Sequence, residues 1–179
     1  REAAVGAISD PVRLFQEQRG IMGLTPVAAL NENKDTKPLY ALLQIFQEKK
    51  LQDFQSFTTT NTTNTLSHYN LSQTDCIRHM RLLSLCSLAT EHEEIPYDAI
   101  ATTLQIDEAD VEQWVIAAVS SGLLSAKMDQ LQRVVMVEGC VVRRFGMEQW
   151  EVLQRRLDVW KRNVRGVLEG LKASGQIVQ

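Results

Sequence analysis

The feature that most constrains the fold lies near the end of the chain, where apolar residues recur at alternating steps of three and four. This spacing predicts a long helix with one narrow apolar stripe, as in a coiled coil, rather than the wider face of an ordinary core helix. We call its seven residues the seam: Trp150, Leu153, Leu157, Trp160, Val164, Val167 and Leu171. The positions between them are mostly charged: Arg155, Arg156, Asp158, Lys161, Arg162, Arg165 and Glu169. The seam therefore needs a covering surface, and periodicity alone leaves open whether this is a partner helix or the chain's own core.

Length and composition place the chain in the ordinary globular class. It has 179 residues with 44% hydrophobic content, enough for one domain or for two small domains in close contact. No apolar run is long enough to span a bilayer, and the start at Arg1 rather than Met indicates a fragment of a longer protein. Its three cysteines are odd in number and set among apolar residues, which predicts buried thiols in a reducing compartment, with the cytoplasm as the default.

Charge is distributed unevenly along the sequence. Residues 1–90 carry 9 basic and 8 acidic side chains, residues 91–142 carry 2 and 10, and residues 143–179 carry 8 and 4, which sums to the net charge of −3. An acidic middle is thus followed by a basic helical tail, and any partner has to fit both.

The first 90 residues have the composition of short helices separated by loops. Helices are predicted over 2–8 and 11–18, and the apolar spacing over 37–49 and 51–57 predicts an αα-hairpin. The polar tract over 58–65 predicts a solvated loop or a ragged helix start. Ser72 is placed to cap a long, fully packed helix that extends to about Thr90.

Residues 91–142 have the order and length of a winged-helix domain. A short extended piece at 95–97 precedes a helix over 98–104, a tight turn and a second helix over 107–121, with Asp107 as its N-cap. Gly122 ends that helix, and two runs of strand character over 123–128 and 133–137 predict a β-hairpin.

The charges of the second helix argue against nucleic-acid binding through this module. Between Asp107 and Ser121 the sequence has four acidic residues and no Lys or Arg. A helix that enters the major groove depends on cations for most of its affinity, so this one would set acids against phosphates. The alternative that remains is a winged-helix protein that binds nucleic acid through its basic tail: Arg143, Arg144, Arg155, Arg156, Lys161, Arg162 and Arg165.

The sequence predicts no catalytic residue, no cofactor and no metal site. It has none of the glycine-rich, nucleophile or metal-ligand motifs whose spacing carries chemistry. His68, His79 and His92 lack the i, i+4 spacing of a helical metal site, and the run of Glu91, Glu93 and Glu94 is typical of a solvated loop. We therefore expect a protein that is not an enzyme.

Several stretches carry a resemblance to a known family: MRLLSL from Met80, DEADVEQWVIAAV from Asp107, KMDQLQRVVMV from Lys127 and RFGMEQWEVLQRRLDVWKRNV from Arg144. The most specific pieces are the DQ-x-QR hairpin and the FG-x-x-QW start of the last helix. Together with the order of elements they resemble PCI domains, which occur in subunits of the proteasome lid, the COP9 signalosome and eukaryotic translation initiation factor 3. The motifs resemble the initiation-factor members most, and the signalosome is the nearest alternative.

The resemblance implies a mostly α fold in three parts. Helical repeats of the PCI domain occupy 1–90, a winged-helix subdomain 91–142, and a C-terminal helix for bundle assembly 143–179. Such subunits associate laterally through their winged helices, and their terminal helices gather in a bundle.

The implied function is that of a non-catalytic scaffold subunit in the cytoplasm. It would bind other PCI-domain and helical-bundle subunits, and through the complex the small ribosomal subunit, without specific DNA or a membrane. The expected partner-binding residues are the seam together with the hairpin residues Lys127, Asp129, Gln130 and Arg133.

Overall fold

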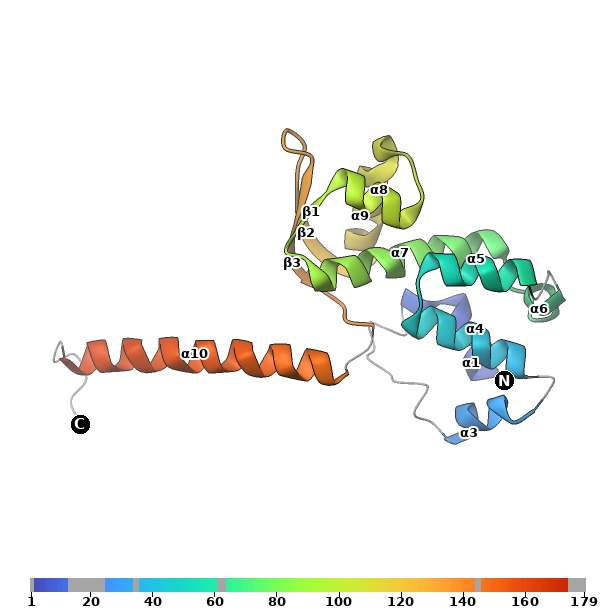
Figure 1. Cartoon of the computed structure of the whole chain (residues 1–179), viewed down its shortest axis with the longest axis horizontal. Coiled ribbons are helices and arrows are strands. Elements are labelled where there is room, and N and C mark those ends of the chain that lie inside the picture. Colours follow the sequence, from blue (N-terminus) through green and yellow to red (C-terminus); the bar gives the residue numbers. More distant parts are fainter. Residues whose placement is uncertain (1, 13–24, 34–35, 61–63, 144–145, 174–179) are drawn as a thin grey trace. The chain divides into compact units, whose positions relative to one another are not determined.

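The computed structural model describes residues 2–12, 25–33, 36–60, 64–143 and 146–173 (Figure 1). The chain divides into two compact units, residues 1–143 and 144–179. Most of the helix predicted over 11–18 lies outside the described residues. Each unit is described by itself below.

The first part of unit 1 consists of helices, as predicted. Its elements are α1 (Glu2–Ser9), α3 (Thr25–Ala28), the 3-10 turn η1 (Ala29–Asn31), α4 (Lys37–Glu48), α5 (Leu51–Thr60), α6 (Asn64–His68) and α7 (Gln73–Glu91). Figure 1 shows α4, α5 and α7 as neighbouring layers. The predicted hairpin of α4 and α5 is confirmed, and Phe46 packs edge-on against Phe54 with ring centroids 5.7 Å apart.

The long helix α7 begins where its cap predicts. The Ser72 hydroxyl accepts a hydrogen bond from the backbone N–H of Asp75 at 3.4 Å, which satisfies one of the first N–H groups of the helix. Eight of its residues are buried: Cys76, Met80, Leu82, Leu83, Ser84, Leu85, Cys86 and Ala89. The helix is therefore enclosed on most of its circumference, as the sequence predicts.

The threonine tract over 58–65 differs in part from its prediction. Residues 58–60 continue α5 rather than forming a loop, residues 61–63 lie outside the described residues, and Asn64 begins α6. The Thr58 hydroxyl donates to the carbonyls of Phe54 at 3.1 Å and Gln55 at 2.8 Å. Because these side-chain bonds use carbonyls of the helix itself, β-branched polar residues are accommodated in its last turn.

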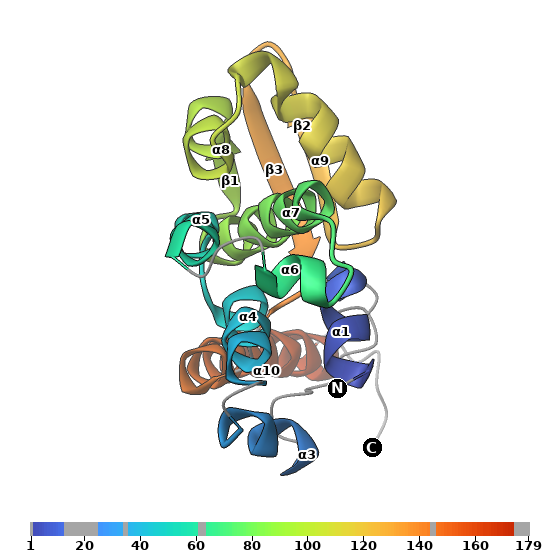
Figure 2. The ribbon, with the colours of Figure 1, turned by 90° about the vertical axis from the view of Figure 1, so that its right-hand side faces the viewer.

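The second part of unit 1 is a winged helix, which confirms that prediction. Its elements are β1 (Glu94–Pro96), α8 (Tyr97–Leu104), the 3-10 turn η2 (Glu108–Asp110), α9 (Val111–Ser120), β2 (Leu124–Asp129) and β3 (Val134–Cys140). The three strands form an antiparallel sheet in the order β1-β3-β2, with Ile95 opposite Val135. Figure 2 shows α8 beside β1 and α9 beside β2.

The second helix of this module starts differently from its prediction. Residues 108–110 form a 3-10 turn, and the Asp107 side chain makes no capping hydrogen bond. The Asp107 carbonyl instead accepts the N–H of Asp110 at 3.0 Å, which closes the turn through the backbone. The predicted end is confirmed, since Gly122 has φ 70° and its N–H donates to the Val119 carbonyl at 2.9 Å.

The helical repeats and the winged helix share one hydrophobic core. It extends from α1 to β3 and includes Leu83 of α7, Ile100 of α8, Val115 of α9 and Val135 of β3, all fully buried. Because apolar contacts are continuous across residue 90, the winged helix packs as the end of the repeat stack.

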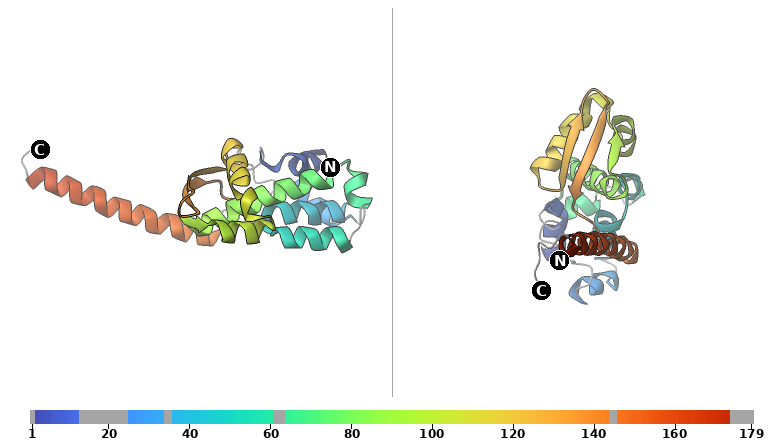
Figure 3. Two further views of the ribbon diagram at one scale, coloured as in Figure 1. Left: turned by 90° about the horizontal axis from the view of Figure 1, so that it is seen from above. Right: turned by 90° about the vertical axis from the view of Figure 1, so that its left-hand side faces the viewer.

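Unit 2 contains the predicted long helix, α10 (Met147–Ala173), which Figure 3 shows as one uninterrupted helix. The FG-x-x-QW motif begins it: the Gln149 side-chain oxygen accepts the backbone N–H of Gly146 at 2.8 Å. This is one half of a capping box, so glycine and glutamine at that spacing fix the start of the helix. None of the described helices is long and apolar enough to cross a membrane.

Candidate assembly interface

The seam of α10 is the largest set of exposed apolar side chains in the described residues. Trp150 is 56% exposed and Trp160 is 67% exposed, and Leu153, Leu157, Val164 and Val167 are exposed as well, whereas Leu171 is partly buried. Unit 2 has no second described element that could cover them. Two tryptophans beside a row of leucine and valine side chains, all exposed to solvent, are typical of a surface that binds a partner.

The hairpin residues predicted to bind partners bond within their own module. The Asp129 carboxylate accepts the backbone N–H groups of Leu131 and Gln132, both at 3.0 Å. Arg133 has φ 54°, a left-handed conformation that tight hairpin turns require. The DQ-x-QR motif therefore builds the turn between β2 and β3.

The same motif attaches the hairpin to the second helix. Gln130 Nε2 donates to Glu112 Oε2 at 3.1 Å, and Arg133 Nη1 lies 2.8 Å from Glu108 Oε1. Glu112 also accepts the Tyr97 hydroxyl at 3.3 Å, and burial together with this carboxylate raises the pKa of Tyr97. These bonds hold the wing against η2 and α9, so Glu108 and Glu112, two of the four acidic residues between Asp107 and Ser121, have a structural use.

Lys127 of β2 forms an ion pair with Glu138 of the neighbouring strand β3. Its Nζ lies 2.6 Å from Glu138 Oε1, and this hydrogen-bonded pair raises the pKa of Lys127 and lowers the pKa of Glu138. Both basic residues of the hairpin thus face carboxylates of the same module. Contact of the hairpin with a partner protein stays a prediction. Because both of its cations are paired with carboxylates, the hairpin is a poor binding surface for phosphates.

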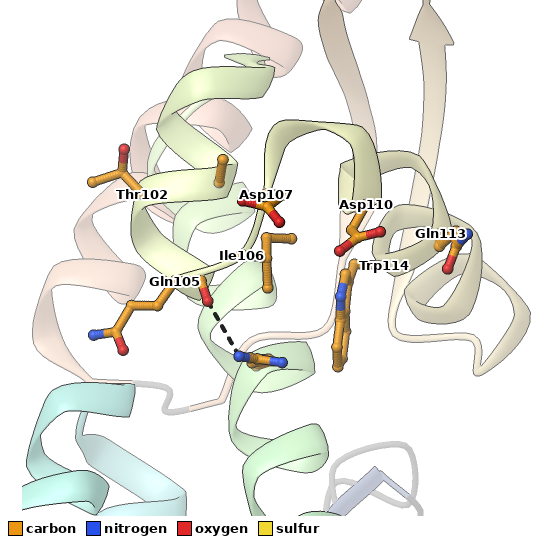
Figure 4. Close-up of a pocket in the computed structure, with 9 residues that line it drawn as sticks. Thr102, Gln105, Ile106, Asp107, Asp110, Gln113 and Trp114 are labelled. Atoms are coloured by element: carbon orange, nitrogen blue, oxygen red, sulfur yellow. Dashed lines mark hydrogen bonds between the residues drawn. The ribbon is translucent and has the colours of Figure 1, made fainter.

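A groove of about 760 Å³ lies between α8 and α9 beside α7 (Figure 4). Figure 4 shows Asp110 and Trp114 along one side, Thr102 and Gln105 along the other, and Asp107 between them. The remaining lining residues are Arg81, Ala101, Ile106 and Gln113.

The cation of this groove is already used by the fold. Arg81 donates to the carbonyls of Leu104 at 3.1 Å and Gln105 at 3.2 Å, and its guanidinium lies 5.2 Å from the centre of the Trp114 ring. It thereby caps the end of α8 and stacks on α9. The lining brings no nucleophile beside a base, and the described residues include no cluster of three metal-ligating side chains.

Arg143 was placed in the basic tail by the sequence, and the structure corrects this. Its Nη1 donates to Ser87 Oγ at 3.1 Å, and its Nη2 donates to the carbonyls of Ile45 and Phe46 near the end of α4. Burial lowers the pKa of this guanidinium to about 10. Arg143 therefore joins the end of the winged helix to α4 and α7. The signal available was its position directly after the apolar pair Val141 and Val142.

The cysteines divide into two groups. Cys76 and Cys86 are buried free thiols, as predicted, and burial raises their pKa values to about 11 and about 12. Cys140 is only partly buried, because it lies at the end of the last strand, where its thiol contacts the Thr90 hydroxyl at 3.4 Å. Thiols held protonated by burial are poor nucleophiles, so the first two are core residues.

These features define a helical-repeat and winged-helix protein that carries a long terminal helix with an exposed coiled-coil seam. Residues 44–138, which are 95 of the 179, match the family described as PCI domain, and the chain therefore belongs to the PCI-domain family. Residues 143–171 match a second family, described as "eIF3 subunit M, C-terminal helix". The predicted resemblance to PCI domains, and among them most to the members from the initiation factor, is confirmed.

Similar curated proteins come from distant organisms. A protein of Dictyostelium discoideum is 44% identical over 130 residues, covering 73% of this chain and 32% of the relative. One of Nematostella vectensis is 35% identical over 173 residues, covering 97% of this chain and 44% of the relative. One of Drosophila mojavensis is 32% identical over 93% of this chain and 41% of the relative. All three are named eukaryotic translation initiation factor 3 subunit M, and the chain spans less than half of their length.

Proposed function

We propose that this chain is part of a non-catalytic scaffold subunit of the eukaryotic translation initiation factor 3 complex. Its mechanism is assembly: the seam of α10 packs against helices of other subunits, and the winged helix adjoins the winged helix of a neighbouring PCI subunit. Through the complex it supports binding of the small ribosomal subunit in the cytoplasm. No step of this mechanism requires a cofactor or a metal ion.

The observation that carries the proposal is the exposed seam on the segment that matches the terminal helix of initiation-factor subunit M. A helix of 27 residues whose apolar stripe lies in water loses most of the stabilisation that packing gives to helices. Covering the stripe with another helix recovers that stabilisation and buries both indole rings.

The two alternatives from the sequence are less well supported. The match of the terminal helix and the names of the relatives favour the initiation factor over the signalosome and the proteasome lid. The alternative of nucleic-acid binding through the basic tail is weakened, because Arg143 is hydrogen-bonded to the repeat stack and is not part of that tail. We propose direct contact of the remaining basic residues with ribosomal RNA only as a secondary role.

Co-purification tests the proposal. The tagged protein is isolated from cells at moderate salt, and the chains that accompany it are identified by mass spectrometry. We expect other initiation-factor subunits together with small-ribosomal proteins. Recovery of signalosome or lid subunits instead would contradict the assignment while leaving the assembly mechanism intact.

Salt separates seam binding from phosphate binding. Apolar packing along the seam should survive a rise from about 0.1 M to about 0.5 M salt, because screening acts on charges. Contacts with phosphates weaken steeply over the same range. Release of all partners by this change would show that the basic residues, and not the seam, hold the complex.

A further inference from the structure

The residues that flank the seam carry charge of one sign only. With Trp150 at position a of a heptad, the flanking e and g positions include Arg156 and Lys161. The other flanking positions hold Met, Gln, Asn, Leu or Gly, and none holds Asp or Glu. The acids Glu151, Asp158 and Glu169 fall at b and f positions, away from the seam.

This arrangement disfavours pairing of the helix with a second copy of itself. In a parallel pair the g residue of one helix faces the e residue five positions further along the other, so Arg156 would face Lys161 at two symmetric places. In an antiparallel pair g faces g and e faces e, and no register supplies an acid because neither position has one. Like charges beside a seam oppose association.

One flank of the seam has a hollow beside Trp160. It has a volume of about 340 Å³ and is lined by Arg155, Arg156, Val159, Trp160 and Asn163. Of these, only Trp160 belongs to the seam, whereas Arg156 and Asn163 hold g positions, so the hollow lies on the g side of the seam. Arg156 therefore borders a recess that a side chain of a covering helix can reach.

We propose that the helix covering this seam belongs to a different chain and carries acidic side chains at the positions that face Arg156 and Lys161. Apolar side chains of that helix cover the seam, and its flanking carboxylates pair with the two cations, the one that faces Arg156 lying at the hollow beside Trp160. The inference rests on the assembly role proposed for the seam and adds the chemistry of the partner. On this proposal, the charges of Arg156 and Lys161 determine which helix binds when several helices have similar apolar seams.

Two synthetic helices test this directly. Both have four heptads with the same leucine and alanine seam, one with Glu and the other with Lys at every e and g position. Each is titrated against the purified protein and followed by fluorescence anisotropy at about 0.05 M and about 0.5 M salt. We expect the Glu helix to bind at least about ten-fold more tightly at low salt, with the preference narrowing at high salt.

Two charge variants test whether Arg156 and Lys161 cause the preference for the Glu helix. The double variant R156E/K161E should reverse the preference, whereas R162E/R165E, with the same change of charge at b and f positions, should leave it within about two-fold. Equal binding of the two helices to the unmodified protein, or tighter binding of the Lys helix, overturns the inference. So does self-association of the protein through the seam, seen by sedimentation, that is tighter than binding of the Glu helix. If W150A/W160A binds both helices as the unmodified protein does, the seam is not the binding surface, and the proposed function fails with it.

Discussion

The two longest helices of the molecule, α7 and α10, place their apolar residues in opposite ways. In α7 eight residues are buried, and they are distributed around most of the helix. In α10 most of the apolar residues form one stripe, and six of the seven seam side chains are exposed. The contrast shows that the width of the apolar face, rather than the number of apolar residues, separates a helix that builds the core of its own chain from a helix that is left with a surface for another.

The same side chain should therefore have different effects in the two helices. Truncation in α7 removes packing within the folded chain and leaves a cavity, so it lowers the free energy of unfolding. Truncation in the seam removes area that is already exposed, so its effect falls on binding. The predictions below begin with this division and run from the largest effect on stability to the smallest.

Leu83→Ala in α7 should lower the free energy of unfolding by about 3 kcal/mol, because Leu83 is fully buried and its loss leaves a cavity. Urea unfolding measures the change. The matched control is Leu157→Ala in the seam, where the side chain is 52% exposed and the expected change is below about 0.5 kcal/mol. An equal loss for both variants would mean that the seam packs on this chain's own core.

Arg143→Met should cost about 2 kcal/mol, because the carbonyls of Ile45 and Phe46 lose a charged donor. Arg162→Met is the control, since that side chain is exposed on α10 and donates to the nearby Asp158 carbonyl. The comparison uses thermal unfolding monitored by circular dichroism. If the two variants unfold alike, Arg143 does not join the winged helix to the repeats.

Gly122→Ala should cost about 1 kcal/mol, because Gly122 has φ 70° and a Cβ atom is strained there. Gly139→Ala serves as the control, since a Cβ atom at Gly139 would meet nothing within 4 Å and that residue lies in β3. Its stability should stay equal or rise slightly. A neutral Gly122→Ala would show that the turn after α9 does not need the left-handed conformation.

His79 should make stability weakly dependent on pH. Burial lowers the pKa of His79 below its ordinary value of 6.5, while Asp10 and Asp75 oppose the shift. Below pH 6.5 the unfolded chain therefore binds more protons than the folded chain, and stability should fall as pH decreases through the window under that value. Urea unfolding at several pH values should show a smaller fall in His79→Gln, whereas the exposed His92→Gln should keep the whole fall.

Much of the fold could be predicted from the sequence because the signals are local. Ser72 caps α7, Gly122 ends α9, and the three-four spacing from Trp150 to Leu171 predicts the last helix. Each of these features depends on residues a few positions apart, where backbone geometry limits the possibilities. The order of these elements, together with the DQ-x-QR and FG-x-x-QW motifs, then indicated the PCI family, which implied a stack of helical repeats followed by a winged helix.

Long-range contacts were not predictable in the same way. Strand β1 pairs with β3 about 40 residues further along, and Arg143 reaches carbonyls of α4 almost 100 residues earlier. The local pattern identifies neither pairing partner, since a three-residue strand and a single arginine are compatible with many environments. The apolar pair before Arg143 indicates burial, but not the carbonyls that the side chain contacts. The DQ-x-QR residues were recognised as specific, but their bonds to Glu108 and Glu112 became visible only in the folded module.

The most direct test of the assembly role is the double variant W150A/W160A, expressed with a tag in cells and compared with the unmodified protein. If the seam binds a partner helix, co-purifying chains should be lost, with each indole contributing about 2 kcal/mol or more to binding. Helical circular dichroism of the purified variant should stay nearly unchanged, because both side chains are exposed. Unfolding of the variant, or full retention of its partners, would contradict the account.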